Sequence, residues 1–554
     1  MRTHVFNATV VVLLVTAFGL PGVVTAAEER QEQSVLIRKA PPVPADLESQ
    51  RIARLPARPE SPPEPAAPAA PAPAPVPEAT EPEEEESETP VALLSADEGC
   101  AVYAGCEHQQ SFQAQVVGAY KEMFFDNNFS YLEDPAYADW HLGENLKRRT
   151  IGDWMIVDVG GQYRLRNHIE RNFRFSPTVP NIGGLTGVDD DFLLHRTRFY
   201  VNSEIGDRVR FFGEMLDARS EFEEVGPRVI EENHTDIQNL FLDVVVADGD
   251  RGKLTGRVGR QEVGLGAGRL ISPLDWANTR RTFEGARLMW QGDQWDIDGL
   301  WVRPLRRYID RLDPPYQDRE IYGVYSTYKG MTRDKLELYW LALHYYDLPV
   351  KYDTIGSRYY GSTDNWLYEL EGGVQFGENA DDSGHGAGFF TLGLGRKFDC
   401  LRGKPTLWSY YDWASGDDTV SNGFHHYEPL VHKYLGFMDL FGRRNIEDAN
   451  LLLTLQPHEK LTLLAWYHFF WLQNGNDVPY NVNMSPFANL PGGSAGSREL
   501  GQELDLTATF LTSPHTNLLI GYSHFFAGEF YATTPGVPFD GDASFLYTQF
   551  TVNF

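Results

Sequence analysis

The densest group of residues able to do chemistry lies in 259–288, which read GRQEVGLGAGRLISPLDWANTRRTFEGARL. Guanidinium groups pair with carboxylates through parallel hydrogen bonds, and an aromatic face can stack on a sugar ring. The segment therefore suits an anionic sugar, while the alternative is that its carboxylate pairs with an arginine and the segment only packs on itself. The residues concerned are Arg269, Asp275, Trp276, Asn278, Arg280 and Arg281.

No catalytic constellation accompanies this group. Nucleophilic catalysis needs a nucleophile beside a base, but Ser523 and His524 are neighbours in an expected strand and face opposite sides. The sequence contains neither GxSxG nor HExxH. His425, His426 and His432 lie together, and we interpret them as part of a solvated loop rather than a metal site. We expect no enzyme activity, metal or cofactor.

The elements that position these residues alternate apolar and polar side chains, which places successive residues on opposite faces of a strand. In 155–169 and 193–204, Arg164, Arg166, Arg196 and Arg198 share the polar face. An arginine facing lipid at the bilayer centre costs roughly 2–4 kcal/mol, so these arginines are expected to face the inside of a barrel. Arg257 and Arg287 are assigned to the same substrate pathway.

The whole pattern predicts an all-β chain that forms a transmembrane antiparallel β-barrel over 151–554. Short turns such as IGDR and QGDQ alternate with long segments near 176–191, 221–234, 265–282, 416–446 and 473–498. Bacterial barrels have short periplasmic turns and long outer loops. We expect eighteen strands, including the weak tenth segment DTIGSRYYG, with sixteen as the alternative count.

Three further segments precede the barrel. Residues 1–26 read as a secretory signal peptide. Residues 27–110 are rich in Pro, Ala and Glu and are expected to form a disordered periplasmic tether. Residues 111–150 contain aromatic side chains that could pack on the periplasmic mouth or plug it. Cys100 and Cys106 could form a local disulfide that leaves Cys400 unpaired, or no bridge forms at all.

The charge and the final segment indicate the partners. A formal charge of −30 argues against nucleic acid. The final segment, ASFLYTQFTVNF, places Leu546, Phe550, Val552 and Phe554 on one face. This pattern resembles the signal read by the outer-membrane assembly machinery. We therefore expect the outer membrane of a Gram-negative-type bacterium as the location, with its lipids and this machinery as partners.

The run PLDWANTRRTFEGARL, preceded by GRQEVGLGAGRL, resembles the signature of the alginate export family of outer-membrane proteins. The segments FFDNNFSYLEDP, GGQYRLRNHIE, YYDWASGDD and HKYLGFMDLFGRRN are similar to parts of its members, so the likeness covers most of 120–554. The resemblance implies an eighteen-stranded channel with an Arg- and Lys-lined lumen that passes an anionic polyuronate by diffusion. It also implies that the segment holding Arg269, Asp275, Arg280 and Arg281 lies near the constriction.

The expected inner faces also carry carboxylates, which predicts an interior of mixed charge. A general uptake porin for anions or sugar acids is the alternative function, and a barrel enzyme or an adhesin with a filled lumen are two more. Periplasmic export proteins are further candidate partners. The carboxylates are Glu204, Glu214, Glu369, Glu371, Glu503 and Asp505.

Overall fold

The computed structural model describes residues 112–174, 184–418, 422–487 and 496–554. All described residues belong to one compact unit. The expected signal peptide, the tether, and Cys100 and Cys106 lie outside the described residues. Cys400 is described, and it is exposed and unpaired.

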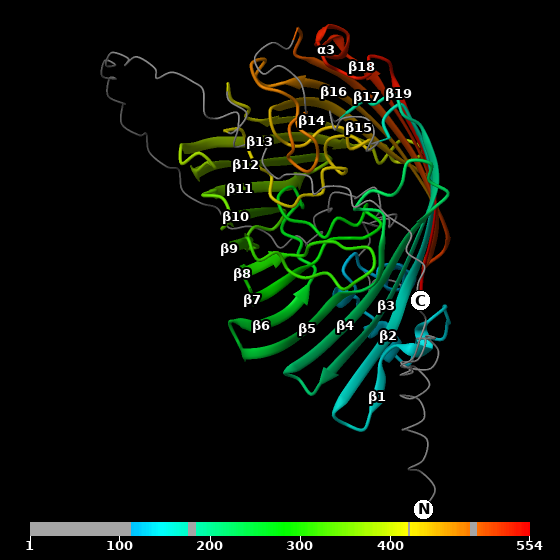
Figure 1. Cartoon of the computed structure of the whole chain (residues 1–554). Helices are drawn as coiled ribbons and strands as arrows, with labels where there is room; N and C mark the ends of the chain where they lie inside the picture. Colours follow the sequence, from blue (N-terminus) through cyan, green and yellow to red (C-terminus); the bar gives the residue numbers. More distant parts are fainter. Residues whose placement is uncertain (1–111, 175–183, 419–421, 488–495) are drawn as a thin grey trace, which may run out of the picture. The chain divides into compact units, whose positions relative to one another are not determined.

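The described residues form one antiparallel sheet that closes on itself (Figure 1). Each strand from β2 to β19 pairs with its sequence neighbours, and β19 pairs with β2, so eighteen strands complete a barrel. A barrel of this kind satisfies every backbone group without an exposed edge. The strands are β1 Arg149–Ile151, β2 Met155–Arg171, β3 Asp190–Ile205, β4 Val209–Glu221, β5 Asn233–Gly249, β6 Gly252–Gln261, β7 Phe283–Gly292, β8 Trp295–Pro304, β9 Arg319–Tyr328, β10 Asp334–Tyr345, β11 Lys351–Thr363, β12 Trp366–Glu378, β13 Gly384–Lys397, β14 Thr406–Ala414, β15 Ile446–His458, β16 Leu461–Leu472, β17 Glu499–Ser513, β18 Thr516–Ala527 and β19 Ala543–Asn553.

The predicted strand count of eighteen is confirmed, including the weak segment DTIGSRYYG, which lies in β11. The short strand β1 was not predicted. It pairs with β2 through Arg149 and Val157, and lies on the same side of β2 as β19 does. It therefore lengthens the hairpin at the start of the barrel rather than adding to the closed ring.

Connections alternate between tight turns and long loops, as expected. The turns after β3, β5 and β7 take two or three residues, whereas the loops 262–282 and 415–445 are long and largely buried. Two further long connections, 305–318 and 528–542, were not identified in the sequence. The second contains the short helix α3 (Glu529–Thr533). The connections that follow even-numbered strands, all on one side of the barrel, thus contain most of the loop residues.

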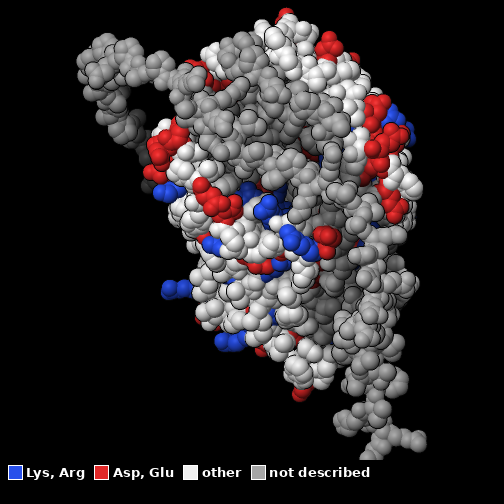
Figure 2. All heavy atoms as spheres, viewed as in Figure 1, with Lys and Arg blue, Asp and Glu red and all other residues white. Residues whose placement is uncertain are grey.

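The two faces of the wall differ as the alternating pattern requires. Leu546 and Phe550 on β19 are 37% and 39% exposed, while Arg164 and Arg198 are 2% and 1% exposed. In Figure 2 the wall facing the viewer is mostly white, with charged side chains gathered in a central group and along the upper edges. The apolar side chains therefore face outward, and the arginines of β2 and β3 face inward.

The segment before the barrel packs against the inner wall. Phe124 and Phe125 form a buried cluster with Tyr200, Phe212 and Phe241 of β3, β4 and β5. Among the described residues, no helix is long and apolar enough to cross a membrane. The segment's helices are α2 Phe112–Val117, η1 Phe124–Asp126, η2 Ser130–Glu133 and η3 Glu144–Leu146.

Candidate functional site

Loop 262–282 connects β6 to β7 and reaches two distant parts of the wall. Residues 275–278 of the loop contact β2 and β3, and Arg269 contacts β12. Because β3 and β12 lie nine strands apart in the eighteen-strand ring, the loop crosses the interior.

Asp275 is at the centre of the contacts with β2 and β3. Its carboxylate pairs with Arg280, lies 2.9 Å from Arg196 and lies 3.6 Å from Arg164. The Asp275 and Ala277 carbonyls also accept hydrogen bonds from Arg164 and Arg196. The strand arginines thus hold the loop through its backbone as well as through one carboxylate, so their positions are fixed.

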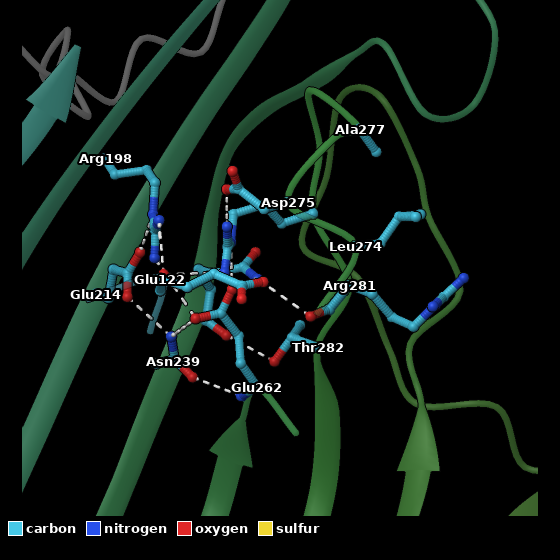
Figure 3. Close-up of polar contacts among 12 residues, drawn as sticks. Glu122, Arg198, Glu214, Asn239, Glu262, Leu274, Asp275, Ala277, Arg281 and Thr282 are labelled. Atoms are coloured by element: carbon cyan, nitrogen blue, oxygen red, sulfur yellow. Dashed lines mark hydrogen bonds and ion pairs between the residues drawn. The ribbon is translucent and has the colours of Figure 1, made fainter. Parts of the chain in front are cut away.

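A second carboxylate, Glu262, joins this group at the root of the loop (Figure 3). It pairs with Arg280 and lies 3.5 Å from Arg198, which also pairs with Glu214 at 2.6 Å. Burial raises the pKa of the Glu262 carboxyl, but Arg280 and Arg198 outweigh it and hold that pKa below its ordinary value. The Asn239 amide donates to both Glu262 and Glu214. Glu262 therefore stays ionised and holds the arginines in place.

Trp276 lies between cationic and aromatic groups rather than against open space. The Arg166 guanidinium lies 3.8 Å from the centre of its ring, and the His432 ring stacks on it at 3.7 Å. Only 8% of Trp276 is exposed. Asn278 donates to the carbonyls of His195, Arg219 and Glu231, so it fastens the loop to the wall. In this conformation both side chains position the loop.

Arg269 lies at the opposite end of the loop. Its guanidinium contacts Glu369 and Glu371 of β12, each at 2.6 Å, and lies 4.2 Å from the Tyr434 ring. Arg358 of β11 contacts Glu369 at 2.7 Å, so two carboxylates face two guanidiniums here. The structure does not bring Arg269 into the Asp275 group.

Arg281 pairs with Glu428 of loop 415–445, at 2.9 Å. Burial lowers the pKa of Arg281; Glu428 opposes that shift, and the nearby Arg307 and Arg319 add to it. The two loops are also joined through their backbones, since Glu428 donates to Leu270 and accepts from Ser272. Loops 262–282 and 415–445 are therefore joined to each other inside the barrel.

Gly266 allows the loop to approach the wall closely. Its φ is +53°, and a Cβ there would collide with the Tyr325 hydroxyl of β9. A left-handed backbone with no room for a side chain requires glycine. Gly266 of the GLGAGRL run thus has a packing role that its place in the sequence alone did not show.

The remaining two predicted residues form separate pairs on the strands. Arg257 contacts Asp243 at 2.7 Å and lies 4.4 Å from the Phe125 ring of the N-terminal segment. Arg287 pairs with Asp298 of β8. The twelve predicted residues therefore divide into one central group around Asp275 and several neutralised pairs.

The expectation of a solvated loop around the histidines was wrong. His426 and His432 are 1% and 3% exposed, because loop 415–445 carries apolar side chains such as Phe424 and Leu435 that are buried in the barrel. Among the described residues, no group of three or more potential ligands is arranged to hold a metal.

Sequence reasoning missed several residues of the site. Glu262 stands inside the GRQEVG run but was not selected, although a carboxylate between two arginines was a usable signal. Glu428 and Asn239 gave no such signal, because their roles depend on contacts across the barrel. Loop 305–318, which reads LRRYIDRLDPPYQD, was also missed.

A family model described as alginate export matches residues 155–540, which is more than half of the chain. The comparison with curated proteins gives no match.

Similar solved structures include OccD3 (OpdP) from Pseudomonas aeruginosa, at 11% identity, covering 72% of this chain and 91% of that one with a TM-score of 0.48. OccAB1 from Acinetobacter baumannii has 9% identity, covers 72% and 96%, and has a TM-score of 0.49. A BenF-like porin from Pseudomonas fluorescens Pf-5 has 12% identity, covers 72% and 99%, and has a TM-score of 0.48.

Proposed function

Because this chain belongs to the alginate export family of outer-membrane β-barrel proteins, we propose that it is a channel for an anionic polysaccharide of the polyuronate class. Diffusion through the barrel is the proposed mode of passage. The family is one of channels rather than enzymes, so the interior side chains act by binding and guiding the polymer and perform no covalent step.

The arginine group around Asp275 carries this proposal. Four guanidiniums meet three carboxylates and Arg166 lies beside them on the Trp276 ring, so the group has an excess of positive charge. Such an excess in a narrow, poorly screened space favours a polymer with one carboxylate per sugar. The arginines are Arg164, Arg166, Arg196, Arg198 and Arg280, and the carboxylates are Glu214, Glu262 and Asp275.

We also propose that the N-terminal segment occupies the pathway in this state. The backbone carbonyl of Glu122 accepts hydrogen bonds from Arg198 and Arg280, at 3.4 and 3.2 Å. The Phe124 ring lies 3.8 Å from the Arg198 guanidinium. A segment that binds the same arginines as the proposed polymer would compete with it, so passage requires its displacement.

The experiment compares ion selectivity and polymer block in planar bilayers. The wild-type channel is expected to favour anions and to be blocked by a hexauronate oligomer. Replacing Arg164 and Arg196 by Gln removes two charges that face Asp275, so selectivity and block should both fall. The matched control replaces Arg257 and Asp243 by Gln and Asn, which neutralises a pair without changing net charge.

A cation-selective wild-type channel, or one that the oligomer does not block, would overturn the proposed function. Equal loss in the control and in the Arg164/Arg196 variant would remove the arginine group as its cause.

A further inference from the structure

Loop 305–318, between β8 and β9, is the most arginine-dense connection on the long-loop side. With its flanking residues it reads RPLRRYIDRLDPPYQDR. It lies on the same side of the barrel as loops 262–282 and 415–445, because all three follow an even-numbered strand. The proposed function does not use this segment.

Loop 305–318 forms a hairpin held by its own backbone hydrogen bonds. Backbone hydrogen bonds join Arg306 to Pro314 and Tyr316 to Pro304, each at 2.9 Å. Asp313 is 1% exposed, accepts a 2.6 Å hydrogen bond from the Tyr308 backbone and pairs with Arg307 at 2.9 Å. These contacts fix the tip, so its outward side chains are held in position before any ligand arrives.

Arg306 and Arg311 are exposed at this tip. Neither has a carboxylate within 4.0 Å or a side-chain hydrogen bond among the described residues, whereas the arginines of the interior described above are all engaged. The Arg311 guanidinium lies 3.6 Å from the centre of the Tyr308 ring, and that of Arg306 lies 5.7 Å from it. Asp310 is the exposed carboxylate of the tip, so the three charged groups sum to a positive charge.

The same loop connects this tip to the interior. Arg307 donates to the Arg280 carbonyl of loop 262–282. Arg319, the first residue of β9, lies 3.7 Å from Glu428, which also pairs with Arg281. The exposed tip is therefore connected through Arg307 to the loop that carries the group around Asp275.

We propose that Arg306, Tyr308 and Arg311 form an outer binding site for the carboxylated sugar rings of an anionic polysaccharide. The two uncommitted guanidiniums bind sugar carboxylates, and the tyrosine between them contacts the apolar face of a ring. A hairpin that is already fixed loses little conformational entropy when it binds. This inference rests on the proposed function and assigns that polymer a contact outside the barrel.

The test measures binding of a hexauronate oligomer to the full-length protein in uncharged detergent micelles that contain no lipid phosphate. Replacing Arg306 and Arg311 by Ala is expected to weaken binding about fivefold and to reduce its dependence on salt, since two exposed ion pairs are lost. Replacing Tyr308 by Leu should weaken binding without changing the salt dependence. A neutral hexasaccharide should bind weakly to all forms.

The matched control replaces Arg251 and Arg333 by Ala. Both are exposed arginines in the short turns of the opposite side and make no ion pair among the described residues. Heat-modifiable migration on a gel confirms that each variant is a folded barrel. Unchanged binding in the Arg306/Arg311 variant, or an equal loss in the control, overturns this site. A wild-type protein that binds no hexauronate instead overturns the proposed function itself.

Discussion

At the scale of single residues, buried charge is retained only because each group has a fixed partner. Glu262 is fully buried, and its oxygens face Arg280, Arg198, Gln238 and Asn239. Taking a carboxylate out of water is costly unless such partners compensate for the lost hydration. Removing one partner of a buried pair is therefore more damaging than removing both. Replacing a buried arginine of the loop is therefore expected to affect the fold.

Arg280→Met should lower stability by about 3–5 kcal/mol, because it leaves Glu262 buried beside one fewer charge. Adding Glu262→Gln to the same protein should restore most of the loss. The measurement is the temperature at which the folded barrel converts to the slower-migrating form on a gel. Equal stability of the single variant and the wild type would show that this pair contributes nothing.

At the scale of elements, alternation of side chains was sufficient to locate the strands. The pattern in 193–204 predicts that Arg196 and Arg198 share the inner face, and both side chains are 1% exposed in the structure. The path of the loops could not be predicted in the same way. Arg269 and Glu369 are 100 residues apart in the chain, and nothing local relates them. The alternation of side chains along a strand specifies which face of the sheet each residue occupies. It does not specify which distant strand a loop will contact.

Loop 415–445 should become less firmly docked in acid. Burial lowers the pKa of His425 to about 3, with Arg444 and Arg319 adding to the shift, and burial also places the pKa of His426 well below its ordinary value. An undocked loop would regain a pKa near 6.5 for both. The undocked form thus binds more protons below that pH, so docking is strongest above it and weakens as the pH falls from about 6.5 toward 3.

Limited proteolysis of the loop across this pH range measures the effect. Cleavage within the loop should increase as the pH falls, and His425→Asn should reduce the pH dependence because Asn does not titrate. Cleavage of the wild type that stays constant between pH 7 and pH 4 would contradict the prediction.

At the scale of the whole molecule, the sequence and the family resemblance predicted a barrel with a packed segment before it. They left open whether that segment packs on the periplasmic mouth or plugs it. Lys147 donates to the Phe554 carbonyl at 3.0 Å and to the Val159 carbonyl at 2.6 Å, so the segment is fastened where β19 meets β2. It then reaches inward as far as Arg280. Contacts of this kind depend on the closed ring and have no signature in any one strand.

Releasing the N-terminal segment should open the channel. Replacing Phe124 and Phe125 by Ala removes two rings from the cluster with Phe212 and Phe241, at about 3–5 kcal/mol for each buried ring. We expect larger and more frequent current steps in planar bilayers. Trp140→Ala is the control, since this residue lies in the same segment but is 65% exposed. Unchanged currents in the double variant, or equal changes in the control, would show that the segment does not obstruct conduction.

Loop 262–282 contacts opposite walls of the barrel. The closed ring of strands cannot widen without breaking hydrogen bonds between strands, so the interior opens by movement of the loop rather than of the strands. Both ends of the loop are rooted in β6 and β7, next to Glu262 and Arg280. The contact of Arg269 with Glu369 and Glu371 lies farthest from those roots. The loop therefore pivots at its two ends in β6 and β7, and Arg269 holds its far end against β12. Opening of the interior along this loop requires Arg269 to leave Glu369 and Glu371, while the strand pairs of the barrel stay intact.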